Sequence, residues 1–299
     1  MNRRDFLLTS AVSAAFSTPI HAQGARLRRA LPRSRESLPA MGMGTWLTFD
    51  VGDEAQPRAQ RREVLRRFFA AGGGVIDSSP MYGRSEQLLG ELLAELPHDG
   101  RLFTSTKVWT IFDRVGPRQL EESLRLWRVP RFDLLLVHNL LNWEAHLKTL
   151  RVWKEAGRVR YIGVSTSHGR KHAEIQRVMR AQPIDAIQIT YNLADASALP
   201  VLDLAAERGI GVFINRPFDG GMLFNAVGAR AVPPWAAEFD CTNWAQFFLK
   251  YVVSHPAVTC AIPGSTKVAH LEDNQAAGHG RLPTAAQRLK MEQFWDSKA

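Results

Sequence analysis

Cysteine is scarce in this sequence, where only Cys241 and Cys260 occur among 299 residues. Zinc sites need several cysteine or histidine ligands at short spacings, and no such spacing occurs, so no metal site is expected. Cys260 lies in an apolar run, AVTCAIPG, which favours a buried packing residue. Cys241 follows a loop-like stretch and could be exposed. A disulfide between them stays an open alternative, because the sequence does not give their Cα separation.

Signatures of nucleotide and nucleic-acid binding are also missing. No G-x-G-x-x-G follows an early apolar run, so a dinucleotide would have to bind by a mode other than the Rossmann fold. The formal net charge is +9, but no helix-turn-helix, zinc-finger or RNA-binding motif accompanies it. We therefore expect a basic surface that attracts an anionic cofactor or substrate, and no nucleic-acid partner.

The first 22 residues have the composition of an export signal. A charged start with Arg3 and Arg4 precedes a moderately apolar stretch and a small residue at a plausible cleavage point, Ala22. The apolar part is too short to span a bilayer comfortably, and the paired arginines are typical of the twin-arginine route, which exports folded proteins. We predict a signal peptide over 1–22, membrane contact only during export, and a periplasmic protein; a disordered basic N-terminus is the alternative. Residues 23–37 are interpreted as a basic linker.

Short apolar runs then alternate with amphipathic helical patterns through the rest of the chain. This order is typical of a parallel sheet covered by helices. Eight strand–helix pairs predict a single-domain α/β protein, a (β/α)8 barrel over 38–299, with an open doubly wound sheet as the alternative. The runs are MGMGTW, GGVIDSS, RLFTSTKV, DLLLVHN, RYIGVST, AIQITYN, GVFINRPF and TCAIPG.

Four polar residues follow or end successive runs: Asp77, Tyr82, Lys107 and His138. Each has an ordinary structural interpretation, such as a turn cap for the aspartate or a satisfied core histidine, but in a barrel all four meet at the carboxyl end. A free phenol has a pKa of about 10. A neighbouring ammonium lowers that value, and a carboxylate beside the ammonium keeps it charged. The set therefore predicts proton donation to a carbonyl oxygen, with hydride from a cofactor.

In its series of motifs the chain resembles the aldo-keto reductase superfamily from about residue 38 to residue 277. The motifs are GMGTW, the 77–90 segment that contains MYGRSEQLLG, STKV, LLLVHN, GRVRYIGVST, IQITYN and IPGSTKVAHLEDNQ, in the family's order. The resemblance implies that Tyr82 is the general acid, that Lys107 lowers its pKa, that Asp77 pairs with Lys107, and that His138 orients the carbonyl. It also implies a nicotinamide cofactor bound without a Rossmann fold, NADP(H) ahead of NAD(H).

The resemblance further implies where the cofactor binds. Thr166 replaces a usual asparagine, Asn215 replaces an aromatic residue that stacks on the nicotinamide in many relatives, and Gly264 replaces a basic residue of some NADPH-preferring relatives. Asn192 is interpreted as a nicotinamide-side residue or as a structural one. The expected cofactor-binding residues are Gly44, Thr45, Ser165, Thr166, Gln188, Asn215, Arg216, Ser265, Lys267, His270 and Asn274. Arg216 is also compatible with a structural ion pair.

The substrate, the reaction direction and the oligomeric state do not follow from the sequence. A small-molecule carbonyl or alcohol is expected, and the 219–243 segment is expected to be loop-rich and to close over the cofactor. A cofactor-binding sensor or subunit with little turnover is the alternative function, and a lyase or isomerase with a Schiff base on Lys107 is a third. An apolar pocket is expected from Trp46, Tyr82, Trp109, Leu140, Asn142 and Trp143.

Overall fold

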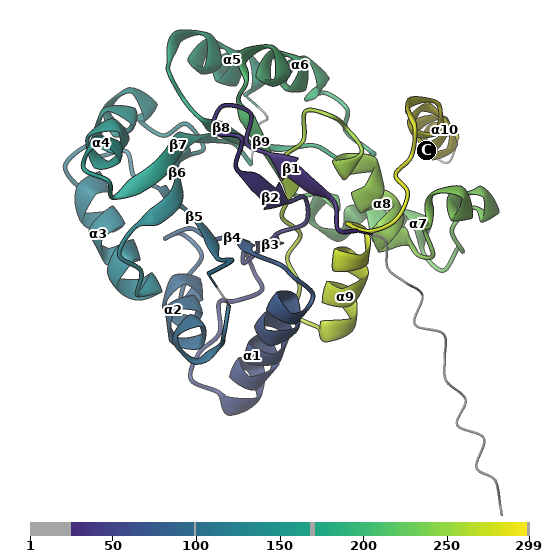
Figure 1. The fold of residues 1–299 in the computed structure, drawn as a ribbon, viewed down its shortest axis with the longest axis horizontal. Coiled ribbons are helices and arrows are strands. Elements are labelled where there is room, and N and C mark those ends of the chain that lie inside the picture. Colours follow the sequence, from purple (N-terminus) through teal and green to yellow (C-terminus); the bar gives the residue numbers. More distant parts are fainter. Residues whose placement is uncertain (1–24, 99, 168–170, 298–299) are drawn as a thin grey trace, which may run out of the picture.

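A barrel of eight parallel strands forms the centre of the molecule (Figure 1). The computed structural model describes residues 25–98, 100–167 and 171–297. The strands are β3 (Met43–Gly44), β4 (Val75–Asp77), β5 (Phe103–Val108), β6 (Phe132–His138), β7 (Val159–Ser165), β8 (Ala186–Thr190), β9 (Gly211–Asn215) and β10 (Cys260–Ala261). Neighbours in the sequence are neighbours in the sheet. Parallel bridges from Met41 to Ala261 and from Gly44 to Gly264 join the two ends. The predicted (β/α)8 barrel is confirmed.

Helices surround the barrel, and each of the eight predicted strands and its following helical stretch is present. They are α1 (Ala55–Ala70), α2 (Ser85–Glu95), α3 (Gly116–Trp127), α4 (Trp143–Glu155), α5 (His172–Ala181), α6 (Leu199–Arg208), α8 (Trp244–Val253) and α9 (Val268–Ala276). α10 (Ala285–Asp296) follows them and begins with a capping box in which Thr284 and Gln287 bond reciprocally. The 219–243 segment contains η1 (Asp219–Gly221), α7 (Met222–Val227) and η2 (Pro234–Phe239).

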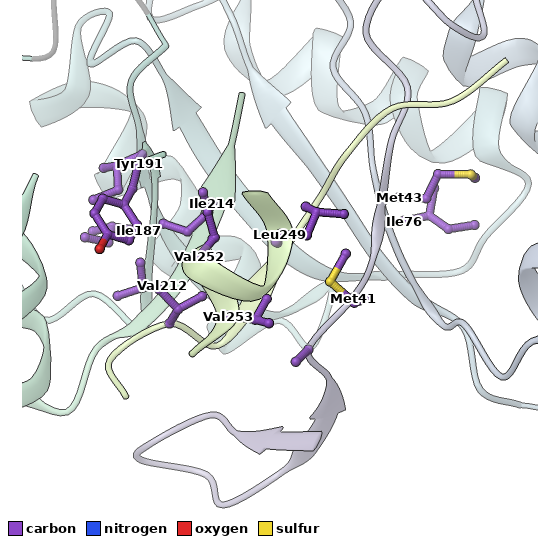
Figure 2. Close-up of a cluster of buried hydrophobic side chains, with 14 of the residues drawn as sticks. Met41, Met43, Ile76, Ile187, Tyr191, Val212, Ile214, Leu249, Val252 and Val253 are labelled. Carbon is purple, nitrogen blue, oxygen red and sulfur yellow. The ribbon is translucent and has the colours of Figure 1, made fainter. Parts of the chain in front are cut away.

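The main core lies between the strands and the surrounding helices. On α8, Leu249, Val252 and Val253 are buried. Figure 2 shows them beside Val212 and Ile214 of β9, with Met43 and Ile76 farther away on the other side of the view. Strands buried on both faces need apolar side chains on both, which is why these strands were recognisable as nearly continuous apolar runs.

The interpretation of 23–37 as a linker is wrong for the part that the structure describes. Strands β1 (Arg28–Ala30) and β2 (Ser37–Pro39) pair antiparallel in a hairpin that lies across one end of the barrel (Figure 1). Leu31 and Leu38 are 3% exposed and join the cluster inside the barrel with Val75, Phe103 and Leu134. The hairpin is therefore part of the core and closes the barrel's base. The signal peptide predicted over 1–22 lies outside the described residues.

The cysteines are both free and buried. Cys260 is buried as expected, but Cys241 is only 4% exposed, so its expected exposure is wrong. Burial raises the pKa of the Cys241 thiol to about 11 and that of Cys260 still further, which keeps both thiols protonated at neutral pH. Among the described residues no helix is both long and apolar enough to cross a membrane.

Candidate active site

A cavity of about 580 Å³ opens at the carboxyl ends of the strands. Its wall is formed by residues on the connections after β3, β4, β7, β9 and β10, by side chains of β6 and β8, and by the glycine-rich turn of η1. The expected site residues that line it are Gly44, Thr45, Asp77, Tyr82, His138, Gln188, Asn215 and Arg216. The carboxyl end of a barrel is where active sites of this fold lie, so the cavity is the candidate active site.

Asp77 is the centre of a buried hydrogen-bond cluster. Its carboxylate accepts bonds from Lys107 Nζ at 2.7 Å, Ser105 Oγ at 2.7 Å and Gln188 Nε2 at 2.9 Å. Lys107 has no exposed surface and donates a second bond, of 2.6 Å, to the carbonyl oxygen of Ser78. The predicted pairing of Asp77 with Lys107 is thus present. A charged pair this deeply buried is stable only when its remaining bonding capacity is also used, as it is here.

The pKa of Tyr82 differs from the expected direction. Burial, and then the negative charge of Asp77, raises the pKa of the phenol above its ordinary value. Lys107 Nζ lies 5.3 Å from the centre of the Tyr82 ring, while its bonds go to Asp77 and Ser78. Burial lowers the pKa of Lys107, and Asp77 opposes that effect. Tyr82 therefore keeps its proton at neutral pH and can serve as a donor.

His138 lies at the end of β6 and faces Tyr82. The two ring centres are 6.1 Å apart and the ring planes are nearly perpendicular. Ser165, at the end of β7, places its hydroxyl 3.5 Å from His138 Nδ1 and 3.4 Å from the carbonyl oxygen of Val137. Both contacts are at the long limit for hydrogen bonds, so this hydroxyl is able to form a shorter hydrogen bond with a ligand.

Hydrogen bonds fix the polar side chains in and behind the cavity wall. Asn215 donates to the carbonyl oxygen of Thr166 at 2.9 Å and accepts from Thr190 Oγ1 at 2.8 Å, so its amide orientation is fixed. Asn192 donates to the carbonyl oxygen of Arg216 at 3.3 Å, which supports the structural interpretation of this asparagine. Thr45 bonds to Ser78 Oγ at 2.9 Å and to the Asp77 carbonyl at 3.1 Å.

Arg216 lines the cavity, and the hydrogen-bonding capacity of its guanidinium is not fully used. Its guanidinium lies 5.7 Å from the centre of the Trp46 ring and reaches Asp219 at 3.5 Å. Its Nε is buried and has no hydrogen-bond partner among the described residues. The residue also adopts a left-handed backbone conformation with φ of 47°, which is unfavourable for a long side chain. Backbone strain of this kind is found at ligand sites, so Arg216 is a candidate for an anionic group.

Six expected cofactor residues lie outside the cavity wall. Ser265 is buried and bonds to the carbonyl oxygen of Lys267 at 2.9 Å, whereas Lys267 and His270 are exposed and Asn274 is buried on α9. Ser165 and Thr166 are buried and are likewise absent from the wall.

The expected apolar pocket is only partly present. Trp46 and Tyr82 line the cavity, but Leu140 and Trp143 are buried in the main core instead. Trp109 is 40% exposed on the loop after β5.

Several residues of the site were not found from the sequence. Met81, Ser167, Phe218, Met222 and Pro263 line the cavity. Met81, Ser167 and Met222 follow predicted strands, and Phe218 and Pro263 lie at the carboxyl ends of two predicted strands, so their positions at strand ends were the available signal. Ser105 alternates with Lys107 along β5 and bonds to the same carboxylate, a relation that the period of two along a strand predicts.

Glu86, close behind Tyr82 in the sequence, was also missed. It is 2% exposed, and its carboxylate accepts bonds from Thr106 Oγ1 at 2.5 Å, Ser123 Oγ at 2.9 Å and Trp127 Nε1 at 3.0 Å. These donors join the start of α2 to β5 and α3. All three are neutral, and burial raises the pKa of this carboxyl group. In the described part of the chain, no group of three or more His, Cys, Asp or Glu side chains is placed to hold a metal ion.

Comparison with known proteins gives consistent matches. The model of the Aldo/keto reductase family matches residues 40–289. An uncharacterized oxidoreductase of Schizosaccharomyces pombe, C215.11c, is 27% identical over 261 residues, which cover 80% of this chain and 81% of the yeast protein. Aldo-keto reductase str7 of Strobilurus tenacellus is 23% identical and covers 75% of this chain and 77% of its own length.

Solved structures share the fold. An aldo-keto reductase from Klebsiella pneumoniae in complex with NADPH superposes with a TM-score of 0.73 at 22% identity, covering 90% of this chain and 95% of that one. The holo form of aldo-keto reductase AKR11C1 from Bacillus halodurans gives a TM-score of 0.74 at 18% identity, over 90% and 96% of the two chains.

Proposed function

The chain belongs to the aldo/keto reductase family, and we propose that it is an NADP(H)-dependent oxidoreductase that reduces an aldehyde or ketone to an alcohol, or runs the reverse reaction. The observation that carries the proposal is that Tyr82, His138 and Asp77 line one cavity, with Lys107 paired to Asp77 directly behind its wall. Family membership alone fixes neither substrate nor turnover, since function depends on the site and not on the fold.

Proton transfer is assigned to Tyr82. Its raised pKa keeps the phenol protonated, so it can donate to a carbonyl oxygen that gains negative charge during reduction. His138, whose ring stands almost perpendicular to the Tyr82 ring, is placed to hydrogen-bond the same oxygen and fix its approach. Lys107, held by Asp77, supplies positive charge that stabilises the phenolate left behind. Burial around these groups excludes water and strengthens each interaction.

The residues present fit a nicotinamide dinucleotide. When bound, this cofactor supplies the hydride that no side chain here can provide. Ser165 and Gln188 are proposed to bind its carboxamide, since the hydroxyl of Ser165 makes only long contacts. Arg216, with its unpartnered Nε, is proposed to hold a phosphate. Lys267 and His270 are exposed beside Ser265 and are the proposed partners of a 2′-phosphate. The NADPH bound to the Klebsiella protein supports this choice of cofactor.

Cofactor binding and turnover are tested separately. Titrating the protein with NADPH and with NADH, followed by tryptophan fluorescence, ranks the two cofactors. Lys267→Glu is expected to raise the NADPH Kd well above tenfold and to spare NADH, because a 2′-phosphate needs a fixed cation. Equal loss for both would remove Lys267 from the phosphate site. Saturable binding without reduction of any aldehyde or ketone would favour the sensor or subunit instead.

Twin-arginine export to the periplasm is a further part of the proposal. It rests on the sequence of 1–22. Export of a folded protein allows a bound cofactor to be carried across the membrane. Outside the cytoplasm there is no obvious pool of reductant that would reduce this cofactor again. Denaturing the exported form and analysing the released nucleotide tests this idea. An exported protein that contains no nucleotide would count against cofactor carriage but not against the reductase chemistry.

A further inference from the structure

Exposed apolar side chains gather at the carboxyl end of the barrel. Ten large hydrophobic side chains are exposed among the described residues, and only Val152 and Leu289 lie elsewhere. The other eight lie on the connections that follow three strands. They are Trp46 and Leu47 after β3, Trp109, Ile111, Phe112 and Val115 after β5, and Met222 and Phe224 after β9. Scattered exposed hydrophobics need no explanation, but a concentration at one face marks a binding surface.

The connection after β5 contributes half of this surface, and we call its four side chains, Trp109, Ile111, Phe112 and Val115, the apolar rim. They are 40%, 61%, 62% and 44% exposed.

The backbone of the apolar rim is fastened rather than loose. The Trp109 N–H donates to Gln119 Oε1 at 2.6 Å, and Gln119 Nε2 donates back to the Trp109 carbonyl oxygen at 3.1 Å. Asn142 Nδ2 donates to the Ile111 carbonyl oxygen at 3.1 Å. These bonds come from α3 and from the turn before α4, so both sides of the connection are held. The apolar side chains are therefore presented to solvent by an ordered segment, which lowers the entropic cost of binding a ligand there.

The exposed apolar surface continues into the catalytic cavity. Trp46, Leu47 and Met222 are each exposed and also line the cavity. Met81 and Tyr82, which follow β4, line it beside them, and β4 is the immediate neighbour of β5 in the sheet. A docked protein or a membrane surface would cover the opening of this cavity, whereas a substrate enters through it. None of the four rim side chains lines the cavity itself. The exposed side chains that do, Trp46, Leu47 and Met222, lie at the same end of the barrel, and this closeness to the cavity opening favours a part of the substrate as the occupant of the rim.

We propose that the substrate carries a long apolar tail, with its carbonyl between Tyr82 and His138 and its tail along the apolar rim. This inference rests on the proposed reductase function and adds the class of substrate. Most of the residues proposed for the cofactor lie on β7, β8 and β9 and on the connections after β7, β9 and β10, while Gly44 and Thr45 lie at the end of β3. The side formed by β4, β5 and β6 is left for the substrate.

A series of straight-chain aldehydes from propanal to dodecanal tests the proposal. Each methylene that leaves water for the rim is expected to raise kcat/KM roughly twofold to fourfold, since complete burial of one methylene gives the upper value. The double variant Ile111→Asn, Phe112→Ser should flatten this rise for the longer aldehydes and leave propanal unchanged. Ile111 bonds to Asn142 and Phe112 to Thr110 Oγ1 through backbone atoms only, so the fold should persist, which a melting curve verifies. Val152→Asn, at an equally exposed site on α4, is the matched control.

Each outcome has a distinct meaning. A rise with chain length that the rim variant loses and the Val152 control keeps supports the proposal. A rise that the rim variant keeps, or propanal reduction with no rise at all, overturns the proposal but leaves the reductase function intact. No reduction of any aldehyde in the presence of bound NADPH overturns both. If the rim variant changes vesicle binding or oligomeric state while the chain-length series is unaltered, the rim has a different occupant and the proposal is wrong.

Discussion

The two ends of this barrel treat charge in opposite ways. At the base, Arg160 donates to Asp133 at 2.7 Å and to Glu36 at 2.5 Å, and Tyr161 donates to the same Glu36 at 2.7 Å. Charges of opposite sign are matched there across β6, β7 and the hairpin connection. At the carboxyl end Asp77 and Lys107 are matched in the same way, but Arg216 has an unpartnered Nε, and buried Glu86 accepts bonds only from neutral donors among the described residues.

Apolar side chains show the same contrast. Leu31 and Leu38 of the hairpin are buried against the inside of the strands at the base. At the carboxyl end the rim leaves Ile111 and Phe112 more than half exposed. The hairpin thus buries its leucines within the chain itself, while the other end leaves apolar area exposed beside the cavity. The ligand cavity and the packed hairpin lie at opposite ends of the barrel, as the fold permits.

Removing the phenol hydroxyl of Tyr82 should give the largest loss of activity and leave the stability of the barrel unchanged. Tyr82→Phe deletes the proposed proton donor, and loss of a general acid costs about 10²- to 10⁴-fold in kcat. NADPH binding and the melting temperature should stay close to those of the parent, because the ring and its packing remain. Steady-state kinetics with one aldehyde checks this. A variant with full kcat would remove Tyr82 from the chemistry.

Breaking the buried pair should affect stability and activity together. Asp77→Asn leaves the ammonium of Lys107 buried without its carboxylate, and removal of one partner from such a pair destabilises by about 3–5 kcal/mol. Activity should fall as well, since the charge beside Tyr82 is no longer held. Urea unfolding and kinetics on the same preparation measure both. Loss of activity with unchanged stability would mean that Lys107 sheds its proton when unpaired.

A substitution at the base should lower stability and leave activity unchanged. Leu31→Ala removes a buried side chain that joins the hairpin to the inside of the barrel, and such truncations cost about 2–5 kcal/mol. The cavity lies at the opposite end, so kcat/KM should not change at temperatures where the variant is folded. Altered kinetics in the folded variant would contradict the separation of the two ends.

The sequence was sufficient for the strands and for the meeting of Asp77, Tyr82, Lys107 and His138 at one end of the barrel. Parallel strands buried on both faces are continuous apolar runs, and polar residues at their carboxyl ends must meet if the barrel closes. The hairpin was missed because only two leucines, Leu31 and Leu38, bury it among surrounding arginines, and their burial depends on strands far along the chain. Local composition therefore resembled that of a linker.

The pKa of Tyr82 was mispredicted for a similar reason. The sequence placed a lysine near the phenol, but not the direction of its ammonium, which turns to Asp77 and Ser78. Nor does a sequence state how far burial raises the pKa. The apolar rim was missed, apart from Trp109, because exposure of Ile111 and Phe112 is a property of the folded loop.

A smaller effect on stability is expected at Glu86, whose buried carboxylate accepts hydrogen bonds only from neutral donors among the described residues. It is compared with a carboxylate that is paired with an arginine. Because burial raises the pKa of folded Glu86, its favourable contribution is fully present below the pKa of the unfolded chain. That contribution is lost as pH rises through the folded value. Glu86→Gln removes the titration and keeps the side chain's size. The ordinary pKa of a glutamate is about 4.5. Relative to the parent, the variant should therefore gain stability as the pH rises from that value toward neutrality.

Asp240 provides the control of opposite sign. Hydrogen bonds from Arg281 lower the pKa of its carboxyl group to about 2. Its contribution is present above the unfolded value near 3.8 and is lost as pH falls through about 2. Asp240→Asn should therefore approach the stability of the parent on acidification, with a small overall difference because the pair is exposed. Urea unfolding across pH measures both variants. Parallel trends for the two would show that hydrogen bonds from Thr106, Ser123 and Trp127 stabilise the ionised Glu86 as effectively as an arginine does.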